Sequence, residues 1–134
     1  MTDPNCIFCK IGKKEINPER TVWENEDFLA FVDLRPVKDG HLLIIPKDHT
    51  DHIFDLDDEK YSEIFQIAKQ LSVPLQKAMG SKRVGIVVEG FGIAHCHVHL
   101  VPIDKGGELD SKNAHEKDSE ELRRVAEKIR EAII

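Results

Sequence analysis

The sequence predicts one α+β domain in which short strands and two long helices share a single hydrophobic core. Three observations predict this class. The chain has 134 residues, a length that suits one core. Short apolar runs between polar turns indicate strands, and two longer segments carry apolar residues at helical spacing. Apolar residues make up 40% of the chain and charged residues 33%, as in ordinary soluble globular proteins.

The first half of the chain is expected to supply a short helix and three strands. Residues 6–14 are the candidate helix, which Asn17-Pro18 ends. Residues 21–24 and 28–32 are predicted strands around a polar turn. Residues 41–45 form a third strand, and its continuous apolar run predicts burial on both faces.

Two long helices are predicted in the second half. The first follows Asp57, a suitable N-cap, and stops at Gly80. Pro74 lies inside it and is expected to kink its last turns, because proline removes a backbone donor. The second helix follows Asp118, and Glu121 three positions on predicts a capping box.

Two further strands are predicted between these helices. Residues 83–89 form the first and residues 94–103 the second, with a tight turn at Gly90-Phe91-Gly92. Residues 105–118 are polar, carry mixed charge and predict a mobile loop or a cover over a pocket.

Composition excludes several classes of function. The formal net charge is −6 without a long basic run, which argues against sequence-independent binding of nucleic acid. No apolar stretch reaches the length of a membrane span, and the N-terminal residues lack the features of a secretory signal. A cytoplasmic protein without membrane partners is therefore expected. The composition does not exclude small phosphorylated substrates, because binding one phosphate needs only a few hydrogen-bond donors.

The three cysteines do not predict a disulfide framework, because their number is odd and the chain is expected to be intracellular. Cys6 and Cys9 form a C-x-x-C pair, which is a redox site, half of a zinc site or a chance spacing. No second C-x-x-C follows, so a zinc ion would need histidine ligands.

The most informative pattern is the alternation of His95, His97 and His99. Side chains two positions apart on a strand share a face, so the three imidazoles should project together while Cys96 points to the core. The alternative to a chemical role is a solvated strand face. Three histidines favour chemistry, either metal ligation or catalysis.

Catalysis at phosphorus suits this cluster. A neutral imidazole attacks a phosphoryl centre well, and a second imidazole beside it can donate hydrogen bonds to the phosphate oxygens. Glycine backbone, as at Gly90 and Gly92, can approach a phosphate closely.

Four sequence blocks resemble a bacterial-type histidine triad (HIT) domain. These are residues 6–11, 30–36, 40–49 and 95–101, so the resemblance covers about residues 5–104. The resemblance implies a single HIT domain over residues 1–134, completed by a C-terminal loop and helix at 105–134. It also implies an antiparallel sheet with one long central helix and a C-terminal helix.

The resemblance assigns His97 as the nucleophile, which attacks the α-phosphorus of a nucleotide and forms a nucleotidyl-histidine. It implies that His99 contacts the same phosphate and that His41 supports the site, although His41 could also be a buried, hydrogen-bonded strand residue. Asp33 matches the carboxylate that binds the ribose hydroxyls. The residues that match the apolar walls around the base, each of which could equally be ordinary core, are Phe8, Ile11, Phe31 and Leu34.

The resemblance also implies one structural zinc per chain, held by Cys6, Cys9, His49 and His95, and no organic cofactor. Four such ligands close a tetrahedral site. One departure stands out: the Asn, and the Ser or Gln, that many family members place near residues 87–94 are absent. The group that protonates the leaving group therefore stays open, with Glu89 either assisting or lying at the surface.

The predicted function is hydrolysis at the α-phosphate of purine nucleoside phosphoramidates or related nucleotides. The alternatives are a dinucleoside polyphosphate hydrolase and a nucleotide-binding protein with little turnover. A further alternative is a metallohydrolase in which His95, His97 and His99 hold a catalytic metal, although three nearly parallel side chains are an awkward tripod. The expected partner is a small nucleotide, and the resemblance implies a homodimer.

Overall fold

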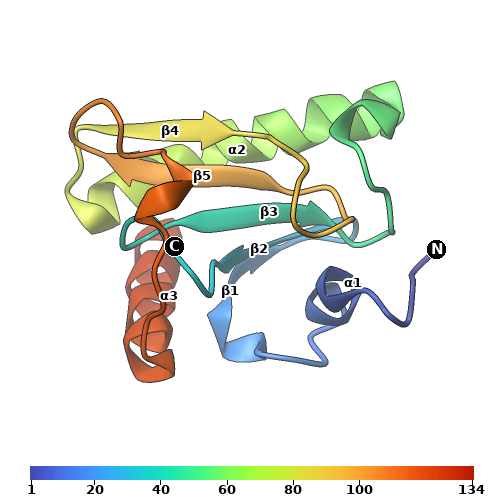
Figure 1. Ribbon diagram of the computed structural model, residues 1–134, viewed down its shortest axis with the longest axis horizontal. Coiled ribbons are helices and arrows are strands. Elements are labelled where there is room, and N and C mark those ends of the chain that lie inside the picture. The colour runs from blue at the N-terminus through green and yellow to red at the C-terminus, as the bar shows by residue number, and fades with distance from the viewer.

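A five-stranded antiparallel sheet with strand order β1-β2-β3-β5-β4 organises the protein (Figure 1). The computed structural model describes residues 1–134. The strands are β1 (Thr21–Glu24), β2 (Phe28–Val32), β3 (Leu42–Pro46), β4 (Arg83–Val87) and β5 (Val98–Ile103). The helices are α1 (Ile7–Gly12), α2 (Asp58–Met79) and α3 (Ser119–Ile133). The predicted α+β class, with a long central helix and a C-terminal helix, is confirmed.

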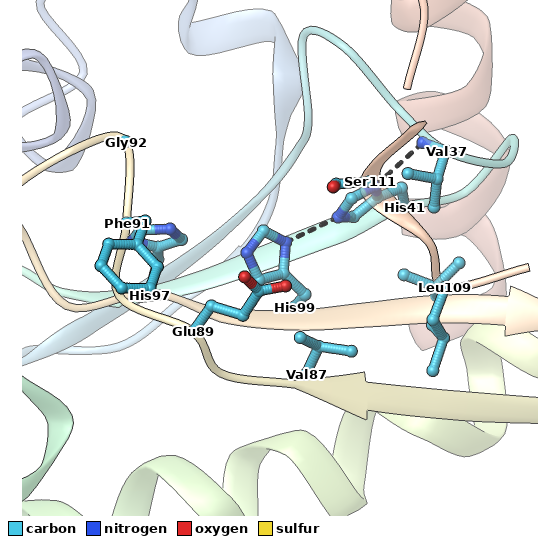
Figure 2. A pocket seen from close by; sticks show the side chains of 11 residues that line it. Val37, His41, Val87, Glu89, Phe91, Gly92, His97, His99, Leu109 and Ser111 are labelled. Carbon is cyan, nitrogen blue, oxygen red and sulfur yellow. Dashed lines mark hydrogen bonds between the residues drawn. The ribbon is translucent and has the colours of Figure 1, made fainter. Parts of the chain in front are cut away.

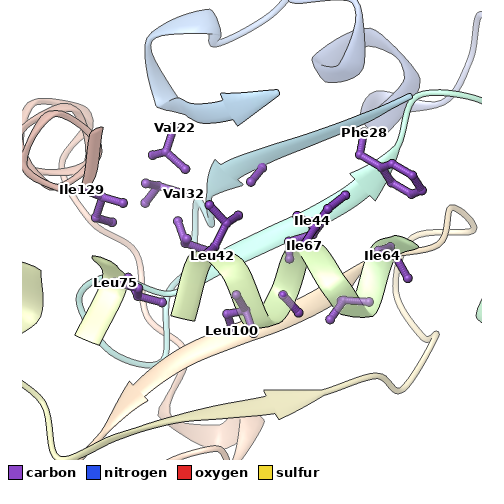
Figure 3. Close-up of a cluster of buried hydrophobic side chains, with 14 of the residues drawn as sticks. Val22, Phe28, Val32, Leu42, Ile44, Ile64, Ile67, Leu75, Leu100 and Ile129 are labelled. Atoms are coloured by element: carbon purple, nitrogen blue, oxygen red, sulfur yellow. The ribbon is translucent and has the colours of Figure 1, made fainter. Parts of the chain in front are cut away.

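Both faces of the central strands are covered, which explains why β2 and β3 are buried at every position. Phe28 and Val32 of β2 belong to a large core with α2 and α3 (Figure 3). Phe31, which points to the other face, belongs to a smaller core with α1. Continuous apolar runs are expected for strands buried on two sides, so the burial predicted for both faces of the third strand is confirmed.

Local signals set the ends of α2 as predicted. The Asp57 carboxylate accepts a hydrogen bond from the Lys60 backbone N–H at 2.8 Å. Gly80 ends the helix with φ 64°, a conformation that costs a glycine little. The helix continues through Pro74 to Met79. None of the helices combines the length and the apolar character that crossing a membrane would require.

Three predicted details need correction. The strand expected over residues 94–103 begins only at Val98, because the Cys96 N–H donates to the Thr50 carbonyl at 2.6 Å instead of joining the sheet. The strand expected to reach Glu89 ends at Val87. The predicted capping box does not close, because the Glu121 carboxylate pairs with Lys117 Nζ at 3.3 Å.

Candidate active site and metal centre

A cavity of about 320 Å³ lies over the β4–β5 side of the sheet (Figure 2). Strand β5 and the residue just before it contribute His99 and His97, and His41 directly precedes β3. The other polar side chains that line it are Glu89, after β4, and Ser111, from the C-terminal loop. The apolar lining residues are Val37, Val87, Phe91, Val101 and Leu109.

A backbone carbonyl fixes the proton on His97. Its Nδ1 lies 2.7 Å from the carbonyl oxygen of His95, and because a carbonyl can only accept, Nδ1 carries the hydrogen. In the neutral ring Nε2 is then unprotonated and keeps its lone pair. His97 is only 7% exposed and lines the cavity, so this ring presents a nucleophilic nitrogen in a confined space.

A chain of hydrogen bonds orients His99 in the same way. The Val37 N–H donates to His41 Nδ1 at 3.1 Å, so the neutral His41 ring carries its hydrogen on Nε2. That nitrogen lies 2.8 Å from His99 Nδ1 and donates to it. The remaining nitrogen of His99, Nε2, must then carry hydrogen, and in Figure 2 it points toward His97. His99 therefore offers an N–H donor beside the nucleophilic nitrogen.

Burial keeps these two rings neutral. Desolvation lowers the pKa of both His41 and His99 to about 4, and the mutual proximity of the imidazoles adds to it. At neutral pH the hydrogen-bond directions derived above therefore hold. The arrangement needs neutral rings, because a second proton on either histidine would place two N–H groups against each other.

Asp33 lies beside this chain but not among the residues that line the cavity. Its Oδ2 is 3.4 Å from His41 Nε2, and its Oδ1 accepts from the Arg35 N–H at 3.1 Å. Burial raises the pKa of Asp33, opposed mainly by the Arg35 amide and then by the nearby imidazoles. The partly buried carboxylate is at the end of β2, next to the histidine cluster.

The four apolar residues expected at the base do not gather in one wall. Phe8, Ile11 and Phe31 are buried in the smaller core, where the Phe8 and Phe31 rings meet edge-on with centroids 5.5 Å apart. Phe8 also packs edge-on against His97 at 5.2 Å. Leu34 is 52% exposed. None of the four lines the cavity, and in this structure the first three are core residues.

A second cluster joins residues far apart in sequence: Cys6, Cys9, His49 and His95, whose ligand atoms all lie within 4.8 Å of one another. Cys6 Sγ is 3.3 Å from His95 Nδ1, and Cys9 Sγ is 3.4 Å from His49 Nδ1. In a tetrahedral zinc site the distance between a sulfur and a nitrogen ligand is about 3.5 Å. The distances of the cluster are thus close to those that zinc requires.

The hydrogen bonds around this cluster fit a metal as well. His95 Nε2 lies 2.8 Å from the carbonyl of Pro46 and must donate to it, so Nδ1 turns its lone pair toward the thiols. The Asp3 N–H donates to Cys9 Sγ at 3.4 Å. Burial raises the pKa of the Cys9 thiol, a cost that a bound cation would offset. The residues present therefore fit a closed, structural zinc site.

His95 connects the two sites. Its ring belongs to the Cys/His cluster, whereas its backbone carbonyl holds Nδ1 of His97. The three histidines point to the same face, as predicted, but they divide between the cluster and the cavity. Cys96 points to the opposite face and lies in the large core, as expected.

Sequence reasoning missed several lining residues. Leu109 and Ser111 reach the cavity from the loop that was expected to be either mobile or a cover over the pocket, without named contact residues. Lys38 Nζ lies 2.9 Å from Glu108 Oε2, and this ion pair connects the loop to the segment before β3. The mixed charge of the loop was visible in the sequence, but the pairing of Glu108 with Lys38 was not.

An α+β fold in which an H-x-H-x-H segment brings one nucleophilic and one donating imidazole to a common cavity defines the histidine triad class of proteins. Known proteins share these features. The model of the HIT domain family matches residues 14–106. The adenosine 5′-monophosphoramidase of Saccharomyces cerevisiae is 37% identical over 127 residues, which cover 90% of this chain and 77% of the yeast protein. The chain belongs to the HIT family.

Solved structures share the whole architecture. A HIT-like protein from Bartonella henselae superimposes with a TM-score of 0.84 at 28% identity, over 98% of this chain and 99% of that one. A zinc-bound histidine triad family protein from Mycobacterium smegmatis gives a TM-score of 0.79 at 27% identity, over 96% of this chain and 93% of that one. The HIT family membership that the sequence predicted is therefore confirmed.

Proposed function

We propose that this protein hydrolyses purine nucleoside phosphoramidates at the α-phosphate through a nucleotidyl-histidine intermediate on His97. The observation that carries the proposal is the 2.7 Å hydrogen bond between His97 Nδ1 and the His95 carbonyl, which leaves the Nε2 lone pair free in the cavity. The similarity to a yeast adenosine 5′-monophosphoramidase supports the choice of substrate class.

In the first step Nε2 of His97 attacks the α-phosphorus. A nitrogen–phosphorus bond forms, the bond from phosphorus to the leaving nitrogen breaks, and the leaving nitrogen takes up a proton from water and departs as an amine. The imidazole gains positive charge during this step. The His95 carbonyl, which accepts from Nδ1, stabilises that charge as it develops.

In the second step a water molecule attacks the same phosphorus. The new oxygen–phosphorus bond forms as the bond to His97 breaks, so that the Nε2 lone pair is restored and the water proton passes to solvent. The products are a nucleoside monophosphate and the amine. The first step needs a neutral His97, and the backbone carbonyl selects the tautomer that presents the unprotonated Nε2.

His99 and His41 act through the phosphate oxygens. The N–H of His99 donates to an oxygen whose charge increases in the transition state, and His41 holds His99 in the tautomer that makes this possible. Because the donor is part of a fixed chain that begins at the Val37 amide, little reorganisation is needed when charge develops.

The nucleoside is proposed to lie on the β2–β3 side of the triad. Asp33 can accept from two neighbouring ribose hydroxyls, and exposed Leu34 offers apolar surface to the base. Phe31, Phe8 and Ile11 would contribute from the smaller core, where Phe8 already touches His97. Binding would then require these core side chains to move aside.

Zinc is proposed at Cys6, Cys9, His49 and His95, where it would cross-link the N-terminal segment to the chain before β5. It would act on structure and not on the reaction. The thiolates it needs persist in a reducing compartment, which agrees with the expected cytoplasmic location. A homodimer, and the absence of nucleic-acid and membrane partners, remain part of the proposal.

The test is capture of the intermediate. The wild-type protein is mixed with adenosine 5′-phosphoramidate and quenched within milliseconds under alkaline denaturing conditions. Mass spectrometry should find one adenylyl group on the peptide that contains His97. The His97→Ala variant should show neither adduct nor turnover, while His115→Ala, which changes a histidine outside the cavity, should retain both.

Normal turnover by His97→Ala would refute the proposed mechanism. Binding of the nucleotide without turnover by the wild type would instead identify a binding protein. A diadenosine polyphosphate assayed beside the phosphoramidate distinguishes the two hydrolase activities.

A further inference from the structure

The charge of the cavity differs from that of a polyphosphate site. Glu89 is the only one of its 11 lining residues that belongs to the Asp, Glu, Lys and Arg group. Neither lysine nor arginine lines it. Sites that hold several phosphates usually supply such cations, because phosphate groups bind best to charged donors. The one fixed charge in this cavity is therefore negative.

The Glu89 charge is available to a ligand. Its side chain is exposed and lines the cavity. Two acidic side chains of the C-terminal loop, by contrast, are paired: Glu108 with Lys38 at 2.9 Å and Glu116 with Arg35 at 3.4 Å. No ion pair of this kind engages Glu89. A cation placed in the cavity would thus meet a carboxylate that no other residue neutralises.

Phe91 adds an apolar surface at the same place. It lines the cavity although 83% of its surface is exposed. Gly90 and Gly92 on either side have φ of 86° and 89°, a backbone conformation that keeps this turn tight and suits glycine. Because this ring borders the cavity, it can cover an apolar part of a bound molecule. Leu109 supplies a second apolar side chain in the same cavity.

Strand order separates this part of the cavity from the nucleoside side. His97 and His99 belong to β5 and the residues before it, which lies between β3 and β4. Asp33 follows β2 and lies toward the β3 side, whereas Glu89 and Phe91 follow β4. Figure 2 shows both side chains reaching from the segment after β4 toward the rings of His97 and His99. A substrate bound across β5 with its ribose at Asp33 would place its leaving group at Glu89 and Phe91.

We propose that Glu89 and Phe91 form a leaving-group subsite that selects amines with a second, positively charged group on an apolar chain. This inference rests on the proposed function and specifies its substrate class. Glu89 attracts the cation, and Phe91 with Leu109 covers the apolar part. The same carboxylate repels the several negative charges of a nucleotide leaving group, so dinucleoside polyphosphates are poor substrates.

The test is a set of adenosine 5′-phosphoramidates that differ only at the far end of the leaving amine. The amines are 1,6-diaminohexane, hexylamine and 6-aminohexanoate, which end in a cation, a methyl group and an anion. For the wild type, kcat/KM should decrease in that order by about tenfold at each step, as expected for one charge interaction near a protein surface.

Two substitutions of Glu89 carry the decisive result. Glu89→Gln should make the three rates similar, and Glu89→Lys should reverse their order and improve hydrolysis of a diadenosine polyphosphate. Glu131→Lys is the matched control, because it changes the net charge equally at an exposed position outside the cavity. If Glu89→Lys hydrolyses the three substrates in the same order of kcat/KM as the wild type, the inference is overturned.

The contribution of Phe91 is measured separately. Phe91→Ala should raise KM for the hexylamine substrate about tenfold and leave KM for unsubstituted adenosine 5′-phosphoramidate nearly unchanged, since ammonia has no chain to cover. An equal effect on both substrates would exclude the apolar contact. If the wild type hydrolyses none of these compounds, the proposed function itself fails, which is a different result from turnover without selectivity.

Discussion

Protonation of the buried His41 should destabilise the protein in mild acid. Burial lowers the pKa of His41 from 6.5 to about 4, and its Nδ1 accepts from the Val37 amide while its Nε2 donates to His99. In the unfolded chain the same imidazole binds a proton near pH 6.5. Between these two pH values the unfolded state therefore holds more protons than the folded state, and the free energy of unfolding decreases as pH falls.

The size of this effect follows from the two pKa values. The pKa of His41 is 6.5 in the unfolded chain and about 4 in the folded protein. This difference lowers the free energy of unfolding at pH 4.5 by about 2.5 kcal/mol relative to pH 7.5. The contribution is complete above pH 6.5 and gone below pH 4. His41→Gln removes the titrating group and keeps a side-chain N–H that can donate toward His99.

The assay is urea unfolding at pH 7.5, 6.5, 5.5 and 4.5 for the wild type, His41→Gln and the control His115→Gln. The unfolding free energy of the wild type should decrease about 2.5 kcal/mol more than that of His41→Gln over this range. Carboxylates and zinc ligands titrate in all three proteins, so their effect cancels in the difference. Equal pH dependence of the wild type and His41→Gln would refute the argument that burial keeps this ring neutral.

Three further outcomes are expected. Elemental analysis is expected to find one zinc per chain in the wild type and none in Cys6→Ser, which should also melt at a lower temperature. A metal-free wild type that is as stable as Cys6→Ser would contradict the zinc site. Asp33→Asn should raise KM for an adenosine phosphoramidate about tenfold but change KM for its 2′,3′-dideoxy analogue little, and an equal change for both would remove Asp33 from ribose binding. His97→Ala should bind a non-hydrolysable adenosine nucleotide with a Kd within about threefold of the wild type in calorimetry, which separates loss of the nucleophile from loss of the fold.

Local interactions account for the parts of the fold that the sequence predicted well. The ends of α2 depend on the Asp57 side chain and on the conformation of Gly80, both of which act within one turn of the helix. The two-sided burial predicted for the third strand, β3, follows from its unbroken apolar composition. These signals involve neighbours in the chain, so reading them does not require the tertiary structure.

Distant contacts explain the details that were wrong. The strand predicted from Ala94 starts at Val98 because the Cys96 amide bonds to Thr50, 46 positions away. The sequence also left open whether Phe8 and Phe31 contact the base or belong to the core; in the structure they pack against each other in the smaller core. An apolar residue that lines a pocket and one that fills a core have the same sequence pattern, so only packing separates them.

The sequence by itself determined the fold class, the HIT family and the candidate residues for zinc ligation and for attack on phosphorus, because residue type and spacing carry that information. Tertiary structure decided which nitrogen of His97 holds the proton, how Val37, His41 and His99 orient one another, and that Leu109 and Ser111 line the cavity. The physical reason is that a tautomer is set by its hydrogen-bond partner and a cavity by the elements that surround it. Those partners come together only when segments distant in the chain are packed.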